Sequence, residues 1–167
     1  YKKIRRLNWF RPHFSRNGLM SQSNITSLLK KLLPQTKIEN TKILISIVAT
    51  NLNTGKLHLF ENGDSIKSTC ASCAFPGIYK PITLNNQFMV DGGILNNVPA
   101  DICRQKIGQD NIVISSMLEG PFDNSLNSLN NPFQIVWRAI YIPLIHSRAK
   151  IVKENSDVIL KPLDKIY

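Results

Sequence analysis

Residues 88–99 read FMVDGGILNNVP, and the rest of the chain is best interpreted around them. A short apolar segment leads into a single carboxylate, Asp91, and two glycines follow it at once. An aspartate at the end of a strand, beside flexible glycines, is held rigidly on one side and open to close approach on the other. This arrangement suits a general base. On these residues alone, a tight Asp-Gly turn between two strands is the simpler interpretation.

Length and composition predict one globular domain with its own core. The chain has 167 residues, of which 43% are hydrophobic and 19% are charged, as is ordinary for such domains. Its formal net charge of +10 favours anionic partners, namely nucleic acid, acidic lipid surfaces or phosphate-bearing substrates. Much of the charge lies in residues 1–17, which we interpret as a basic connecting segment. Nucleic acid is not expected as a partner, because no recognisable nucleic-acid-binding module is present.

Cysteine content and hydropathy bear on the compartment. The three cysteines are an odd number, which argues against a disulfide framework and fits a reducing compartment such as the cytoplasm. No run of 18 or more apolar residues is present, so no membrane span is predicted, while the basic charge leaves room for peripheral contact with an anionic membrane surface. Cys70 and Cys73 form a C-x-x-C pair without a second pair or a nearby histidine. We expect neither a metal ion nor a cofactor.

Helical and extended patterns alternate along the chain. The predicted helices cover residues 23–33, 65–74, 99–106 and 132–155, and the predicted strands cover 43–49, 56–60, 78–84, 87–90, 112–118 and 157–160. The runs at 43–49 and 112–118 are almost continuously apolar, as in strands that are buried on both faces. The pattern therefore predicts an α/β fold with a mixed, largely parallel sheet flanked by helices.

Familiar catalytic motifs are missing from the sequence. It has no glycine-rich phosphate loop, no H-E-x-x-H and no G-x-S-x-G. The nearest fragment to the last, GDSIK at 63–67, lacks the second glycine, and Ser65 stands where a helix start favours a capping residue. If Asp91 is a base, the hydroxyl that it would activate must therefore come from elsewhere.

Four stretches, taken in order, resemble the C-terminal part of a patatin-like phospholipase domain. They are SIVATNLNTG at 46–55, ASCAFPGIY at 71–79, VDGGILNNVP at 90–99 and NIVIS at 111–115. The resemblance implies a three-layer α/β fold, a Ser–Asp dyad without histidine, and acyl-ester substrates that are mostly phospholipids. By motif match, Asp91 is the dyad base, and Gly92 and Gly93 let the backbone pack against the nucleophile-bearing turn. Together the four stretches reverse the preference for a simple turn.

The sequence departs from the family in one respect. The serine motif and the glycine-rich oxyanion loop belong N-terminal to these four stretches, and neither is present in the 167 residues. We therefore expect a partial acyl hydrolase domain over 1–167, with its N-terminal part missing and a family-like core at 18–163. A lost oxyanion donor alone costs about 2.7–4 kcal/mol, and without a nucleophile the covalent route is closed. The chain alone is predicted to be inactive.

A second hypothesis is a non-catalytic relative that binds a lipid surface or a protein. The basic charge and the apolar, aromatic-rich stretch at 133–142 would provide interfacial contact. A helix packed on the sheet explains the same stretch without any partner.

Overall fold

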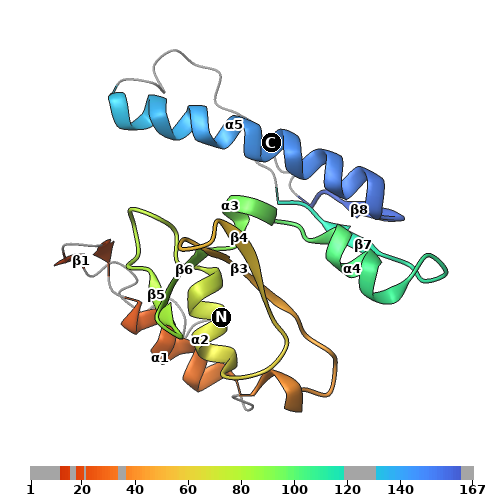
Figure 1. Ribbon diagram of the computed structural model, residues 1–167, viewed down its shortest axis with the longest axis horizontal. Coiled ribbons are helices and arrows are strands. Elements are labelled where there is room, and N and C mark those ends of the chain that lie inside the picture. The colour runs from red at the N-terminus through yellow and green to blue at the C-terminus, as the bar shows by residue number, and fades with distance from the viewer. Residues whose placement is uncertain (1–11, 16–17, 21, 34–36, 119–130, 163–167) are drawn as a thin grey trace. The chain divides into compact units, whose positions relative to one another are not determined.

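The computed structural model describes residues 12–15, 18–20, 22–33, 37–118 and 131–162 (Figure 1). The chain divides into two compact units, Tyr1–Leu95 and Asn96–Tyr167, and each is described by itself. Most of the predicted connecting segment at 1–17 and most of the predicted loop at 119–131 lie outside the described residues.

The first unit is built on a four-stranded sheet with the order β4-β3-β6-β5. Its strands are β3 Ile47–Asn51, β4 Lys56–Phe60, β5 Ile82–Leu84 and β6 Gln87–Asp91. The strands predicted at 78–84 and 87–90 pair as the hairpin of β5 and β6, and both residues of its turn, Asn85 and Asn86, have positive φ angles of 48° and 62°. Asparagine tolerates this left-handed backbone, which two-residue hairpin turns of this kind require. Two further strands, β1 Pro12–Ser15 and β2 Gly18–Met20, pair only with each other.

The predicted mixed α/β content is confirmed, but the largely parallel character of the sheet is not. All three strand pairs of the four-stranded sheet are antiparallel. Two of the pairs are local, since turns at 52–55 and 85–86 connect β3 to β4 and β5 to β6, and a parallel pair needs a much longer crossover. The third pair, β3 with β6, joins strands that are distant in the sequence. Within the described ranges, parallel pairing occurs between β7 and β8.

The strand predicted at 43–49 is wrong in its first half. Strand β3 begins at Ile47, which lies opposite Phe60, the last residue of β4. Before that position β4 offers no further partner, and the side chains of Ile43 and Leu44 are 79% and 100% exposed. An almost continuous apolar run therefore changes from solvent-exposed to buried within a few residues.

Helix α2, Ser65–Ser72, covers the sheet of the first unit and contacts β3, β5 and β6, while α1, Ser23–Leu32, packs on α2 (Figure 1). The close fit of α2 depends on small side chains, because Ala71 is completely buried, as is Ala74 just beyond the helix. The buried core consists of Ile38, Ala49, Phe60, Ala71 and Met89. Ile38 reaches it from a short 3₁₀ helix, Ile38–Asn40.

The second unit contains α4 Ala100–Ile107, β7 Ile114–Ser116, α5 Pro132–Asn155 and β8 Val158–Leu160. The short helix α3, Gly93–Asn96, lies at the division between the units. The predicted long helix at 132–155 is confirmed, and the Asn131 side chain caps it by accepting a hydrogen bond from the Gln134 N–H at 2.9 Å. Helix α5 packs on α4 through a side that includes the buried Val152.

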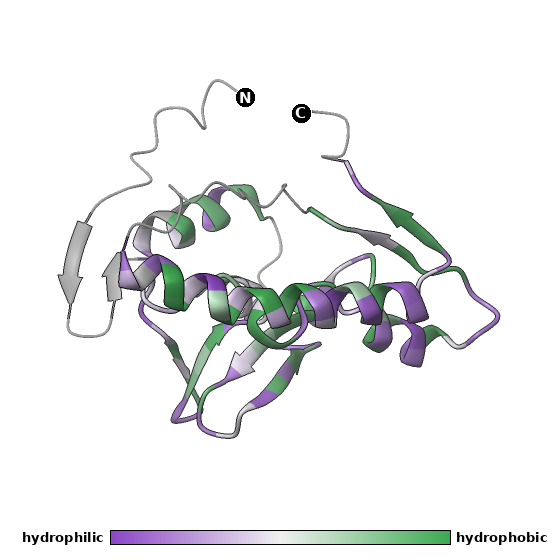
Figure 2. Cartoon of the chain, turned by 90° about the horizontal axis from the view of Figure 1, so that it is seen from above, coloured by the Kyte–Doolittle hydropathy of each residue, from purple (hydrophilic) through white to green (hydrophobic). Residues whose placement is uncertain are grey.

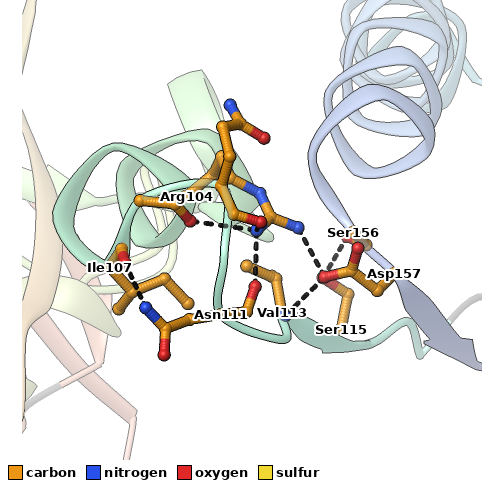
Figure 3. A network of polar contacts seen from close by, with 9 residues as sticks. Arg104, Ile107, Asn111, Val113, Ser115, Ser156 and Asp157 are labelled. Carbon is orange, nitrogen blue, oxygen red and sulfur yellow. Dashed lines mark hydrogen bonds and ion pairs between the residues drawn. The ribbon is translucent and has the colours of Figure 1, made fainter.

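Arg104 organises the polar interior of the second unit (Figure 3). Its buried guanidinium donates to the carbonyl oxygens of Gly108 at 3.1 Å and Asn111 at 2.6 Å, and it forms an ion pair with Asp157. The Asp157 carboxylate also accepts the Val113 N–H at 2.7 Å. One side chain thereby joins the end of α4, the loop that follows and the start of β8. Arginine is seldom buried without partners, and here the hydrogen bonds of Arg104 offset the cost of removing its charge from water.

We predict that Arg104→Leu lowers the free energy of unfolding by about 1–3 kcal/mol, because it removes the hydrogen bonds from the guanidinium to two backbone carbonyl groups and its ion pair with Asp157. Urea unfolding followed by circular dichroism measures this loss. The matched control is Gln105→Leu on the exposed side of the same helix, which should change stability by no more than about 0.5 kcal/mol. Equal effects of the two substitutions would contradict the role assigned to Arg104.

The same network predicts a pH dependence. The Val113 N–H and then the Arg104 guanidinium hold the pKa of Asp157 below its usual value. A lowered pKa in the folded state stabilises the fold above the unfolded-state pKa, and this stabilisation is lost as the pH falls through the folded-state pKa. The difference in stability between the wild type and Arg104→Leu should therefore narrow in acid, below about pH 4. An unchanged difference at low pH would show that the ion pair contributes nothing.

Candidate active site

The backbone of Asp91 is fixed on several sides. As the last residue of β6, Asp91 lies opposite Ala49 of β3. Its N–H donates to the Ala74 carbonyl oxygen just beyond α2 at 3.0 Å, and its own carbonyl oxygen accepts the Thr50 hydroxyl at 2.9 Å. Strand pairing, a helix end and a buried side chain thus hold this one peptide segment, so the carboxylate projects from a rigid support.

The carboxylate of Asp91 is half-buried. One of its oxygens accepts the Gly93 N–H at 2.7 Å. Burial raises the pKa of Asp91 above its usual value, and the hydrogen bond from Gly93 lowers it in part. A carboxylate that is partly removed from water binds a proton more readily than an exposed one, which is the property that a general base needs near neutral pH.

Gly92 is required by a close approach between two strands. A Cβ atom added at this position would lie 2.5 Å from the Val48 carbonyl oxygen and 2.8 Å from the Val48 carbonyl carbon. Real Cβ atoms do not approach backbone that closely, so any larger residue would push β3 away from the end of β6. Gly93 contributes the N–H that binds Asp91 and begins α3. The two glycines of the motif therefore have different tasks beside the same carboxylate.

Cys73 was not predicted as a neighbour of Asp91. Desolvation and then the negative charge of Asp91 raise the pKa of the Cys73 thiol. The chain connection explains this proximity, because Cys73 precedes Ala74, whose carbonyl oxygen binds the Asp91 N–H. Cys70, its partner in the C-x-x-C pair, is buried with its sulfur 3.3 Å from the Thr26 hydroxyl oxygen. In the described ranges, no group of three or more His, Cys, Asp or Glu side chains could hold a metal ion.

The predicted helix start at Ser65 is confirmed, and the residue that caps it is Asp64. Asp64 accepts hydrogen bonds from the N–H groups of Ile66 and Lys67 at 2.9 and 3.0 Å, which is the geometry of a helix N-cap. Ser65 is the first residue of α2 and is buried. Sequence reasoning missed Thr50 and Ala74, like Cys73, as neighbours of Asp91. The sequence signals for Thr50 and Ala74 were, respectively, a hydroxyl in a largely apolar strand and a small residue at the end of a helix.

The geometry defines a rigid, half-buried carboxylate on a glycine-dependent strand end, and comparison with known proteins places it in a family. A sequence model described as patatin-like phospholipase matches residues 2–104, more than half of the chain. The chain therefore belongs to the patatin-like phospholipase family. The matched region includes Asp91, Gly92 and Gly93.

Individual relatives agree with the family match. An uncharacterized NTE family protein of Mycobacterium bovis is 31% identical over 88 residues, which cover 53% of this chain and 24% of the relative. Lysophospholipase NTE1 of Meyerozyma guilliermondii is 30% identical over 76 residues, covering 46% of this chain and 5% of the relative. A probable lipid hydrolase of Invertebrate iridescent virus 6 is 28% identical over 89 residues, covering 50% of this chain and 31% of the relative. The chain thus spans about a quarter of the length of the first of these relatives.

Of the helices in the described ranges, none is both long enough and apolar enough to cross a bilayer.

We predict that Gly92→Ala destabilises the fold by about 1–3 kcal/mol, because the added methyl group overlaps the Val48 backbone. Urea unfolding measures the loss. Gly77→Ala is the control, since a Cβ there meets open space although φ is +81°, and left-handed backbone alone costs about 1–2 kcal/mol. In Gly92→Ala the pKa of Asp91 should also move, whereas in Gly77→Ala it should not. An unmoved Asp91 titration in Gly92→Ala would contradict the link between this contact and the carboxylate.

A second prediction concerns the cost of keeping Asp91 ionised. Because burial raises its pKa in the folded state, ionisation of Asp91 opposes folding, and stability is lost as the pH rises through the folded-state pKa. Asp91→Asn keeps the acceptor for the Gly93 N–H and removes the charge. It should therefore be more stable than the wild type at pH 7, and the gain should vanish below about pH 4. Thermal unfolding across pH measures this, with the exposed Asp110→Asn as a control, and a less stable Asp91→Asn would overturn it.

Proposed function

We propose that this chain is the base-bearing part of a lipid acyl hydrolase that uses a Ser–Asp dyad. The observation that carries the proposal is the half-buried Asp91 carboxylate with a raised pKa, held on a rigid strand end inside the family-matched region. Catalytic bases characteristically combine burial, a shifted pKa and rigid placement. The names of the relatives, a lysophospholipase and a probable lipid hydrolase, favour acyl-ester lipids as substrates.

In the proposed mechanism, Asp91 accepts the proton of a serine hydroxyl as the serine oxygen attacks the ester carbonyl carbon. The leaving alcohol takes that proton, an acyl-serine forms, and water then releases the fatty acid with Asp91 again acting as the base. Direct proton transfer from serine to aspartate needs contact between the two groups and shielding from water. The raised pKa of Asp91 reduces the difference between its pKa and that of the serine hydroxyl. Gly92 and Gly93 keep the backbone beside the carboxylate thin enough for the serine-bearing turn to approach.

The serine and the oxyanion loop are proposed to come from polypeptide outside these 167 residues, which would complete a three-layer domain around the core at 18–163. Surfaces in both units support this. In the first unit, the apolar side chains of Ile43 and Leu44 precede β3 in solvent. In the second, the parallel pair β7–β8 exposes Ile114, Val158 and Leu160, although parallel sheets are normally covered on both faces. We also propose that the protein works in the cytoplasm, at the periphery of a membrane.

The alternative is a non-catalytic relative that binds a lipid surface or a protein. The absence of G-x-S-x-G from the sequence and the exposed apolar side chains on α5 favour it. Under this alternative, the strand end at Asp91 has a structural role, and its carboxylate takes part in no reaction.

The deciding experiment compares two proteins, the 167-residue chain and the same chain extended by its upstream coding sequence to include a G-x-S-x-G motif. We predict no lysophospholipid hydrolysis by the chain alone and turnover by the extended protein. In the latter, Asp91→Asn should lower kcat at least about a hundredfold, as expected for loss of a general base, with little change in KM. Asp110→Asn is the matched control.

Three outcomes contradict the proposal. Robust hydrolysis by the 167-residue chain that Asp91→Asn abolishes would show that the nucleophile lies within it. Full activity of Asp91→Asn in the extended protein would remove Asp91 from the mechanism. An upstream sequence without a serine motif would favour the non-catalytic alternative.

A further inference from the structure

Helix α5 carries a continuous apolar surface that is exposed to solvent. Four large side chains on its N-terminal half, Ile135, Val136, Ile140 and Ile142, are 52%, 57%, 50% and 43% exposed. Ala139 and Pro143 are exposed as well. At 3.6 residues per turn all six lie on one side of the helix. We call these residues, Ile135, Val136, Ala139, Ile140, Ile142 and Pro143, the exposed α5 face.

The opposite side of α5 accounts for the packing of this helix. Tyr141, Leu144 and Ile145 are half-buried, and the same side continues into the buried Arg148 and Val152 farther along. The exposed α5 face is therefore not the side that the second unit uses to fold. Isolated exposed hydrophobic residues are common on proteins, but a contiguous apolar patch indicates a contact surface.

The charge of α5 indicates what covers this face. On the same side of the helix, the C-terminal half presents the exposed Lys150 and Lys153. No acidic residue occurs from 132 to 153, and the first is Glu154. In Figure 2, apolar colouring dominates the first part of the helix and hydrophilic colouring its C-terminal end. One face thus changes along its length from apolar to charged, where Lys150 and Lys153 are joined by the exposed Glu154.

We propose that the exposed α5 face binds the surface of an anionic lipid bilayer, with its isoleucines among the upper acyl chains and Lys150 and Lys153 at the phosphate headgroups. A helix with apolar and basic surface lies at such an interface without crossing it. The proposal rests on the proposed function in one respect, since a bilayer is where a lipid-ester substrate is found. A protein partner or a second copy of the chain would also satisfy the apolar residues, but the excess of basic over acidic residues along α5 favours an anionic surface.

Vesicle co-sedimentation tests this with the 167-residue chain carrying Asp91→Asn, so that binding is measured without turnover. The vesicles contain phosphatidylcholine alone or phosphatidylcholine with phosphatidylserine. We expect binding to the anionic vesicles, weakened by salt. Ile135→Ser combined with Ile140→Ser should reduce the binding constant about tenfold or more, because two apolar side chains no longer transfer from water. Lys150→Glu combined with Lys153→Glu should remove the dependence on phosphatidylserine.

The matched control is Ile43→Ser combined with Leu44→Ser, which changes two apolar side chains that are more exposed than those of α5. It should bind vesicles like the parent protein, and circular dichroism should show that every variant is folded. Ala139→Trp in a background that carries both Trp9→Phe and Trp137→Phe leaves one tryptophan as a local reporter, whose emission should shift to shorter wavelength on binding.

Several results would overturn the proposal. They are unchanged binding after the isoleucine substitutions, an equal loss in the control, or an emission that vesicles do not shift. A dimer that the isoleucine substitutions dissociate, without vesicle binding, would assign the face to a second copy. None of these results bears on hydrolysis, and loss of turnover in Asp91→Asn with intact vesicle binding would leave this proposal standing.

Discussion

The fit of Gly92 under the Val48 backbone is the contact on which the first unit depends. It sets how closely β3 and β6 approach where β6 ends, and Asp91 is the residue immediately before it. A shift of one residue in this pairing would turn Asp91 to the other face of the sheet and would place a side chain where only glycine fits. Steric exclusion of any side chain at Gly92 therefore fixes the position of the Asp91 carboxylate as much as hydrogen bonding does.

The same strand end holds the Asp91 carboxylate in a position where its ionisation is disfavoured. A half-buried Asp91 with a raised pKa gains one hydrogen bond from Gly93 and loses part of its hydration. Such a site lowers stability, as is common at positions where proteins carry out chemistry. The nearby Cys73 responds to the same negative charge through its own raised pKa. The electrostatic influence of Asp91 therefore extends to the loop that follows α2.

Features specified by neighbouring residues could be predicted from the sequence, and features specified by distant residues could not. The break between the strands that end at 84 and begin at 87 and the start of α5 at Pro132 depend on backbone preferences of adjacent residues, and both were predicted. The direction of the strands was not, because apolar content reports burial and says nothing about which strand lies alongside. The strand prediction failed at residues 43–46 for a related reason, since a strand needs a partner and β4 ends opposite Ile47. Asp91 was found because its motif is local, whereas its contacts with Thr50 and Ala74 come from separate elements.

Arg104 has a consequence for how the second unit opens. A single guanidinium holds the carbonyl groups of Gly108 and Asn111 and the carboxylate of Asp157, which in turn accepts the Val113 N–H. If any of these groups separates from the others, the buried Arg104 guanidinium loses part of its hydrogen bonding. The end of α4, the loop after it and the start of β8 should therefore fluctuate as one cooperative segment, with common rather than independent rates of amide hydrogen exchange.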